Sequence, residues 1–161
     1  MPASKKTEET GFIRELRIVY KRKKTKSIAG NATITGPEKV VELFRDLQDE
    51  TKEKLLIVNL DGASKILAFE VVAIGSTNAC HARPIEIFSS SFLTRATGAI
   101  IIHNHPSGQV EPSKADVDFT KKLLDTADTI GLKLIDHIII GYEGFYSFAS
   151  ESKLAGRFGW Y

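Results

Sequence analysis

The chain has 161 residues, which is enough for one domain and too short for two domains of ordinary size. Hydrophobic residues make up 42% of it and charged residues 26%, a balance that excludes a disordered tail, a fibrous repeat and a coiled coil. The net charge of +2 is too small to indicate nucleic-acid binding, and the single cysteine, Cys80, excludes an internal disulfide and an all-cysteine zinc site.

No segment of the sequence indicates export or insertion into a membrane. The longest apolar runs, such as residues 71–74 and 99–102, are far shorter than the roughly 20 residues of a membrane-spanning helix. Residues 1–10 are polar, carry acidic groups and lack the apolar core of a secretory signal, so we expect a flexible terminus. Together with the cysteine count, these features predict a reduced, cytoplasmic protein.

The N-terminal part of the chain predicts a strand and then a helix. Apolar and charged side chains nearly alternate over residues 15–20, which is typical of an edge strand. The basic run at residues 21–26 indicates a solvated loop or hairpin tip, with a patch for phosphate or an acidic partner as the alternative. Pro37 suits a first helical turn, and the apolar spacing after it predicts a helix over residues 37–50.

The middle of the chain predicts a hairpin. Two short apolar segments, residues 55–60 and 66–74, flank the turn dipeptide that begins at Asp61. Residues 84–96 then indicate a second helix, and the isoleucine-rich residues 98–102 predict a strand that is buried on both faces.

The C-terminal part predicts a helix over residues 113–130 and a strand over residues 132–141. The apolar side of the helix is formed by Val117, Leu123, Leu124, Ala127 and Ile130, and Gly131 ends it. Helices and strands alternate without an internal repeat, so the predicted fold class is mixed α/β (α+β), a single domain with a mixed sheet flanked by helices. Core packing is expected for the aromatic residues Phe145, Tyr146 and Phe148, and either packing or a homodimer contact for residues 158–161.

The segment from His103 to Asp116 contains the most chemistry-bearing residues of the chain. His103 and His105 are two positions apart at the end of the buried strand, so their imidazoles can point to the same side. Ser113 is suited to cap the following helix, with Asp116 three residues further on. Two nitrogens and one carboxylate leave a fourth position for water, as in a catalytic zinc site.

The residues alone leave a second interpretation open. The two histidines can be hydrogen-bonded loop residues, and the helix dipole favours an acidic side chain at Asp116 without any metal.

The spacing His-x-His, seven residues, Ser, two residues, Asp resembles the JAMM motif of the JAB/MPN zinc metalloproteases. The sequence His-Asn-His-Pro-Ser-Gly at residues 103–108, followed by Pro-Ser-x-x-Asp at residues 112–116, looks like the RadC branch of that superfamily. Residues 136–141 continue the resemblance downstream, and it covers residues 37–150. It implies one JAB/MPN-type domain over residues 11–161, with zinc bound by His103, His105 and Asp116.

The resemblance also implies an upstream glutamate as general base. Glu53 fits that place because a strand ending in Leu-Asp follows it, and Glu86 is the reserve candidate. Glu53 would take the proton of a water activated by zinc and pass it to the leaving amine. Ser113 would donate to the oxyanion of the intermediate, although a pure capping role is an equal alternative. Asp136 and His137 also match the family, but both are on the predicted strand over residues 132–141, which favours structural hydrogen bonds over metal binding.

Two departures from the family limit the inference. Ile85 stands where relatives often have arginine, so any role of that arginine is lost or passes to Arg83. We also expect the helix-hairpin-helix segment of long RadC proteins, which would touch DNA, to be absent from this chain.

Three functions follow as hypotheses. The first is a zinc-dependent hydrolase that cleaves a peptide or isopeptide bond in a peptide or protein partner. The second is a non-catalytic module for protein or DNA contacts. The third is a DNA-processing enzyme associated with DNA repair, which only the family's association and the basic run at residues 21–26 support.

Overall fold

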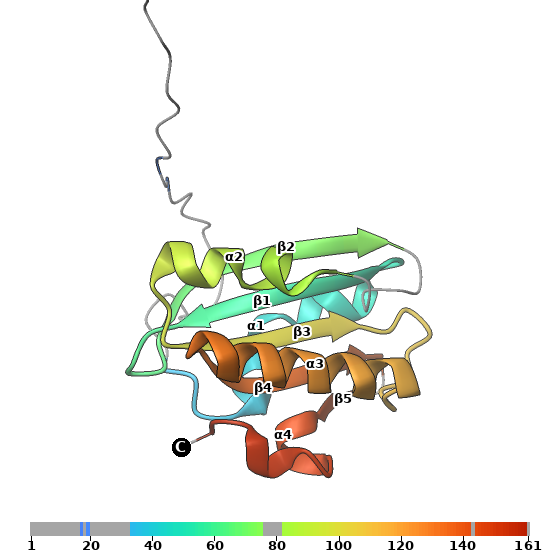
Figure 1. Cartoon of the computed structure of the whole chain (residues 1–161). Coiled ribbons are helices and arrows are strands. Elements are labelled where there is room, and N and C mark those ends of the chain that lie inside the picture. The colour runs from blue at the N-terminus through green and yellow to red at the C-terminus, as the bar shows by residue number, and fades with distance from the viewer. Residues whose placement is uncertain (1–16, 18, 20–32, 76–81, 143, 161) are drawn as a thin grey trace, which may run out of the picture.

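Five strands form one mixed sheet in the order β2–β1–β3–β4–β5, and helices cover both of its faces (Figure 1). The computed structural model describes residues 17, 19, 33–75, 82–142 and 144–160. The elements in chain order are α1 (Pro37–Leu43), the 3-10 helix η2 (Arg45–Asp49), β1 (Glu53–Leu60), β2 (Ile66–Gly75), α2 (Pro84–Thr94), β3 (Gly98–Asn104), α3 (Lys114–Ile130), β4 (Lys133–Gly141), β5 (Gly144–Ser147), α4 (Phe148–Glu151) and the 3-10 helix η4 (Ala155–Arg157). The mixed α/β class predicted from the sequence is confirmed.

The predicted hairpin is formed by β1 and β2, which pair antiparallel. Asp61 fixes the turn between them, because its Oδ1 accepts hydrogen bonds from the backbone N–H groups of Ala63 and Lys65, each at 2.9 Å. This is the side-chain-to-backbone pattern by which aspartate favours turns.

Strand β3 lies in the middle of the sheet, antiparallel to β1 and parallel to β4. All seven of its residues are buried, so the predicted strand is confirmed and extends two residues further, to Asn104. A parallel pair needs a crossover connection, and α3 supplies it between β3 and β4. The start of α3 and the end of β3 therefore lie at the same edge of the sheet, on the right in Figure 1.

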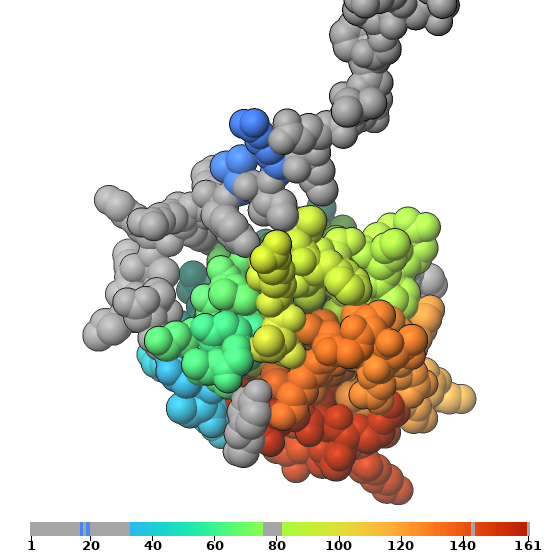
Figure 2. All heavy atoms as spheres, turned by 60° about the vertical axis from the view of Figure 1, so that its left-hand side comes forward, coloured from blue at the N-terminus to red at the C-terminus, as the bar shows by residue number. Residues whose placement is uncertain are grey.

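Helices pack against the two faces of the sheet in separate apolar cores. On one face, β1 and β3 contribute Leu55, Ile57 and Ile101, which pack against residues of α2 and α3. On the opposite face, Leu56 and Val58 pack with residues of α1 and η2. Figure 2 shows the left-hand end of Figure 1, where α2, α3 and the C-terminal segment adjoin one another.

The helix predicted over residues 37–50 is wrong in its length. The α-helix ends at Leu43, Phe44 leaves helical geometry with φ −113° and ψ 19°, and a 3-10 turn follows. The Phe44 ring makes an edge-to-face contact with Phe69 on β2, at a centroid distance of 5.3 Å. The apolar spacing that suggested one long helix is thus divided between two short ones that share the same core.

The C-terminal residues pack against β4 of their own chain. Asp136 on β4 accepts hydrogen bonds from the Ser147 hydroxyl at 2.6 Å and from the indole N–H of Trp160 at 3.1 Å. Its other oxygen accepts from the backbone N–H groups of His137 and Ala149. Burial outweighs these four hydrogen bonds and raises the pKa of Asp136 to about 6. The predicted packing role of the tail is confirmed for Trp160.

Some sequence predictions fall outside the described residues. They concern the flexible terminus at residues 1–10, most of the strand at residues 15–20, the basic run at residues 21–26, and Cys80. Among the helices of the described residues, none combines the length and apolar character that a membrane span requires.

A substitution at Gly141, the last residue of β4, tests how closely the loop after β3 packs against the end of β4. A Cβ atom there would overlap the carbonyl oxygen of Gly108, which accepts a hydrogen bond from the Tyr142 N–H at 3.1 Å. We expect Gly141→Ala to lower the free energy of unfolding by about 1–3 kcal/mol, as overpacking does, measured by urea denaturation. Gly156→Ala is the control, because a Cβ there meets open space. Equal stability of the two variants would contradict this assignment.

Candidate metal centre

His103 and His105 stand at the end of β3, where the strand leaves the sheet. Ala99 and Ile101 face α2 and α3, so the alternation of the strand turns His103 to the same side. His105 follows two positions later, and the Nε2 atoms of the two histidines are 3.0 Å apart. His103 is 1% exposed, whereas His105 is partly open to solvent. The convergence of the two imidazoles predicted from their spacing is confirmed.

Asp116 reaches the two histidines from the first turn of α3. Its Oδ1 is 3.4 Å from Nε2 of His103, and its Oδ2 is 3.7 Å from Nε2 of His105. One ligand atom from each of the three side chains lies within 4.8 Å of the other two. The structure therefore brings together the three residues that the sequence singled out as metal ligands.

Ser113 caps α3 and holds Asp116 in place. Its hydroxyl accepts a hydrogen bond from the Asp116 N–H and donates one to Asp116 Oδ2 at 2.5 Å, and its own N–H donates to the same oxygen at 2.7 Å. Together these bonds form a capping box. The Ser113 hydroxyl is thus engaged with the ligand carboxylate, which matches the capping role left open by the sequence.

The Asp116 carboxylate is anionic despite its burial. Burial opposes ionisation, but the contact with His103 and the hydrogen bonds from Ser113 outweigh it and hold the pKa of Asp116 below its usual range. A carboxylate of this kind provides the negative charge that a cation needs between two neutral imidazoles.

The second ring nitrogen of each histidine is also occupied. His105 Nδ1 lies 2.8 Å from the carbonyl oxygen of Gln109. A carbonyl only accepts, so His105 carries its hydrogen on Nδ1 and presents a lone pair at Nε2. His103 Nδ1 lies 2.8 Å from Nε2 of His137, which is fully buried. Burial holds the pKa of His137 well below its usual value.

Asn104, between the two histidines, ties the end of β3 to the start of β1. Its Oδ1 accepts from the Lys54 N–H at 2.8 Å, and its Nδ2 donates to the Lys52 carbonyl at 3.2 Å. Both bonds go to the neighbours of Glu53, so the amide fixes the backbone of that residue on either side. Because Leu55 pairs with His103, Glu53 lies beyond it at the edge of the sheet where His105 emerges.

Glu53 lines one open cleft of about 730 Å³ together with two of the three candidate ligands, His105 and Asp116. Residues 51–53, at the start of β1, line it together with His105, Ser107, Ser113 and Asp116. Two nitrogens and one carboxylate converge beside this space. The donor set and the adjoining cleft fit a metal held by three protein ligands with one position left for solvent or substrate.

Glu86, the reserve candidate for the general base, is placed elsewhere. Its carboxylate accepts from the Arg83 N–H at 2.9 Å and from the Arg83 guanidinium at 2.8 Å, in a capping box at the start of α2. Hydrogen bonds from Arg83 lower the pKa of Glu86. Glu86 is not among the residues that line the cleft, and Glu53 is.

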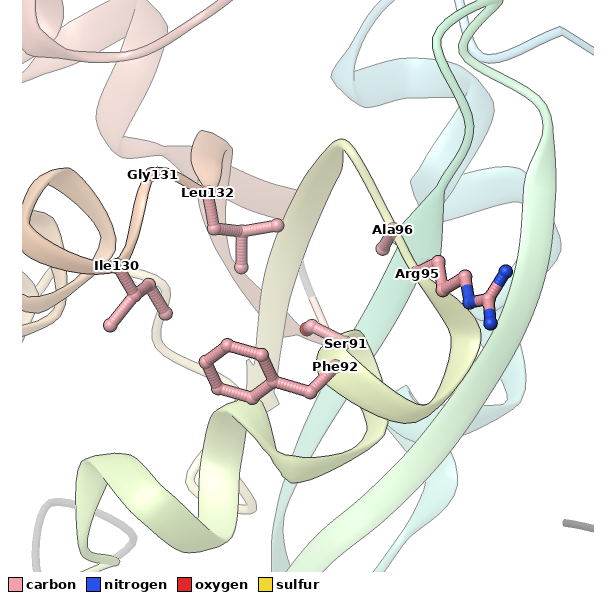
Figure 3. A pocket seen from close by; sticks show the side chains of 7 residues that line it. All are labelled: Ser91, Phe92, Arg95, Ala96, Ile130, Gly131 and Leu132. Atoms are coloured by element: carbon pink, nitrogen blue, oxygen red, sulfur yellow. The ribbon is translucent and has the colours of Figure 1, made fainter.

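A second hollow, at the opposite end of the sheet, lacks such chemistry. It has a volume of about 270 Å³ and lies between the ends of α2 and α3. Phe92, Ile130 and Leu132 gather around it, and the guanidinium of Arg95 points away (Figure 3). No histidine or carboxylate is among its described lining residues, so the cleft beside His105 is the candidate site.

Three contributors to the site were not singled out from the sequence. Asn104 and the carbonyl of Gln109 depend on how the loop folds back, which no local pattern reveals. Thr120, whose hydroxyl lies 2.7 Å from Nδ1 of His137, is on the buried side of α3 together with Phe119. Val117, predicted on that side, is only half-buried. The sequence feature that could have identified Thr120 is a polar side chain one helical turn after Asp116, on the side of the helix that faces the core.

Comparison with known proteins gives consistent matches. The family model described as the RadC-like JAB domain matches residues 34–154. A UPF0758 protein of Aquifex aeolicus is 33% identical over 152 residues, which cover 92% of this chain and 66% of the relative. A UPF0758 protein of Chlorobium phaeovibrioides is 38% identical over 140 residues, covering 86% and 60% respectively. One of Methanosarcina acetivorans is 39% identical over 119 residues, covering 73% and 52%. The chain thus spans half to two thirds of these relatives, whose names state no activity.

Asn104 offers a direct test of how Glu53 is held. Asn104→Ala leaves the part-buried backbone N–H of Lys54 and carbonyl of Lys52 without their partner, so we expect the free energy of unfolding to fall by about 1–3 kcal/mol. Urea denaturation measures the loss, and Gln109→Ala, which truncates an exposed amide in the following loop, serves as control. The assignment fails if Asn104→Ala is as stable as the control.

Proposed function

The chain belongs to the RadC-like JAB domain family, and on that premise we propose that it is a zinc-dependent hydrolase acting on a peptide or isopeptide bond. One observation carries the proposal. His103, His105 and Asp116 converge beside an open cleft, and the same cleft is lined by Glu53. A metal centre and an acid–base group beside one substrate-sized space are the components that hydrolysis of an amide bond requires.

His103, His105 and Asp116 would hold the metal through Nε2, Nε2 and a carboxylate oxygen. Imidazole and carboxylate ligands suit zinc, and three protein ligands are typical of catalytic rather than structural zinc sites. A zinc ion supplies a Lewis acid that polarises the scissile carbonyl and brings the pKa of its water to about 7.

Glu53 acts as the general base and acid of the proposed reaction. Its carboxylate takes a proton from the attacking water and passes that proton to the nitrogen of the leaving amine. Asn104 holds the backbone on both sides of Glu53, which supports this role because proton transfer depends on a fixed position. Glu86 has no corresponding place in the cleft.

Ser113 has two roles in the proposal. In the resting site its hydroxyl donates to Asp116 Oδ2 and so orients the ligand carboxylate. Because Ser113 also lines the cleft, rotation of the hydroxyl would let it donate to the oxyanion that forms on the substrate carbonyl.

Metal content is the first experiment. After zinc is supplied and excess removed by gel filtration, we expect elemental analysis to give about one zinc per chain, because three ligands converge at one point. A variant with both His103→Ala and His105→Ala should lose that zinc while keeping the wild-type circular dichroism spectrum. Absence of stoichiometric zinc from the wild type, or its retention by the double variant, would overturn the proposed function.

Glu53→Gln separates catalysis from metal binding. The variant keeps the shape of the side chain and removes its basicity, so we expect zinc content to be unchanged and hydrolysis to fall about 10²–10⁴-fold. The assay uses a panel of peptide and isopeptide-linked substrates on which the wild type is active. Glu86→Gln is the control and should keep full activity, because an amide still serves the capping box of α2. Full activity in Glu53→Gln would refute the assignment.

A further inference from the structure

A chain of hydrogen bonds runs from helix α3 through the core to the first metal ligand. The Thr120 hydroxyl lies 2.6 Å from the backbone carbonyl of Asp116 and 2.7 Å from Nδ1 of His137. His137 Nε2 lies 2.8 Å from Nδ1 of His103. We propose that Thr120 and His137 are positioning residues that fix His103 in the tautomer whose Nε2 lone pair faces His105 and Asp116. This inference rests on the metal site of the proposed function.

The direction of the chain is set at Thr120. A hydroxyl has one hydrogen, and the Asp116 carbonyl can only accept, so the Thr120 hydrogen points to that carbonyl. The Thr120 oxygen then accepts the hydrogen of His137 Nδ1. His137 is thereby held as the tautomer with its hydrogen on Nδ1.

The His137 ring cannot turn away from this arrangement. It is 0% exposed and stacks on the Phe148 ring, with a centroid distance of 4.9 Å and an interplanar angle of 7°. The Phe119 ring meets it edge-on at 6.1 Å. A neutral imidazole has one N–H, so a hydrogen on Nδ1 leaves a lone pair on Nε2. That lone pair accepts from His103 Nδ1, and His103 presents its own lone pair at Nε2.

The same result is reached at His105 by a different route, through the carbonyl of Gln109. The two Nε2 lone pairs therefore face each other at 3.0 Å, with the Asp116 carboxylate beside them. Facing lone pairs repel one another, so this arrangement is favourable with a cation or a proton between them. Second-sphere partners that fix the tautomer of metal-binding histidines are a general feature of metal sites.

Helix α3 serves the site twice within one turn. Asp116 supplies a ligand with its carboxylate and anchors the hydrogen-bond chain with its backbone carbonyl. Thr120 and His137 are buried in surroundings that are otherwise largely apolar. Burying polar groups costs free energy unless they are paired, and valine or phenylalanine would fill the same space without that cost. A role in orienting His103 accounts for their polarity.

The tautomer of His137 is the direct test, and it needs no variant and no metal. Long-range ¹H–¹⁵N correlation spectra of uniformly ¹⁵N-labelled wild-type protein distinguish a protonated ring nitrogen from one with a lone pair. We expect His137 to carry its hydrogen on Nδ1 and a lone pair on Nε2. A hydrogen on His137 Nε2 would overturn the inference.

Zinc affinity provides the second readout. Thr120→Val keeps the shape of the side chain and removes the acceptor of His137 Nδ1, so we expect zinc to bind about 10–100-fold more weakly in competition with a chromophoric chelator. Thr120→Ser keeps the hydroxyl and should bind zinc with nearly wild-type affinity, even where loss of the methyl group lowers its metal-free unfolding midpoint.

The outcomes separate this inference from the proposed function. Equal zinc affinity in Thr120→Val and the wild type would overturn the positioning role and leave the zinc site intact. Loss of affinity in both Thr120 variants would also overturn it, because the effect would then follow packing rather than the hydroxyl. A wild type that binds no zinc would overturn both.

Discussion

The parallel pairing of β3 with β4 is the constraint on which the site depends. Two parallel strands in one sheet need a crossover, and here α3 makes it, starting beside the end of β3 and running back along the sheet. His103 at the strand end and Asp116 in the first helical turn are therefore brought together by the connection itself. Antiparallel pairing of β1 with β3 places the start of β1, and so Glu53, at the same edge.

The polar groups at this edge are held by one another. Ser113 orients the Asp116 carboxylate, the Gln109 carbonyl orients His105, and Asn104 holds the backbone around Glu53. Within the described part of the chain, no buried side-chain nitrogen or oxygen lacks a hydrogen-bond partner. Fully paired polar groups in a protein interior keep a fixed geometry, and a metal centre requires ligands that do not rearrange.

The sequence predicted correctly those features of the site whose geometry is determined by residues close together in the chain. The alternation of a strand explains why His103 and His105 converge, and the spacing of a capping box explains why Asp116 lies near Ser113. The assignment of Glu53 to the site came from a family resemblance, because the sequence around Glu53 does not show that β1 pairs with β3 beside His103. Asn104 and Thr120 act through contacts across the sheet and the core, which depend on strand register and on the orientation of α3.

The same distinction explains the error at residues 37–50. The apolar spacing of a single helix is present there, but the chain bends at Phe44, whose ring contacts Phe69 on β2. A local pattern does not record such a tertiary contact. The basic run at residues 21–26 lies outside the described residues, and the interpretation of that run stays a prediction from its composition.

The most direct test of the account is a crystal structure of the zinc-loaded protein with anomalous scattering measured at the zinc edge. The account predicts one zinc peak beside the cleft, about 2.0–2.1 Å from Nε2 of His103 and of His105 and about 2.0–2.2 Å from a carboxylate oxygen of Asp116. A zinc ion bound elsewhere, or bound through Nδ1 of either histidine, would contradict it.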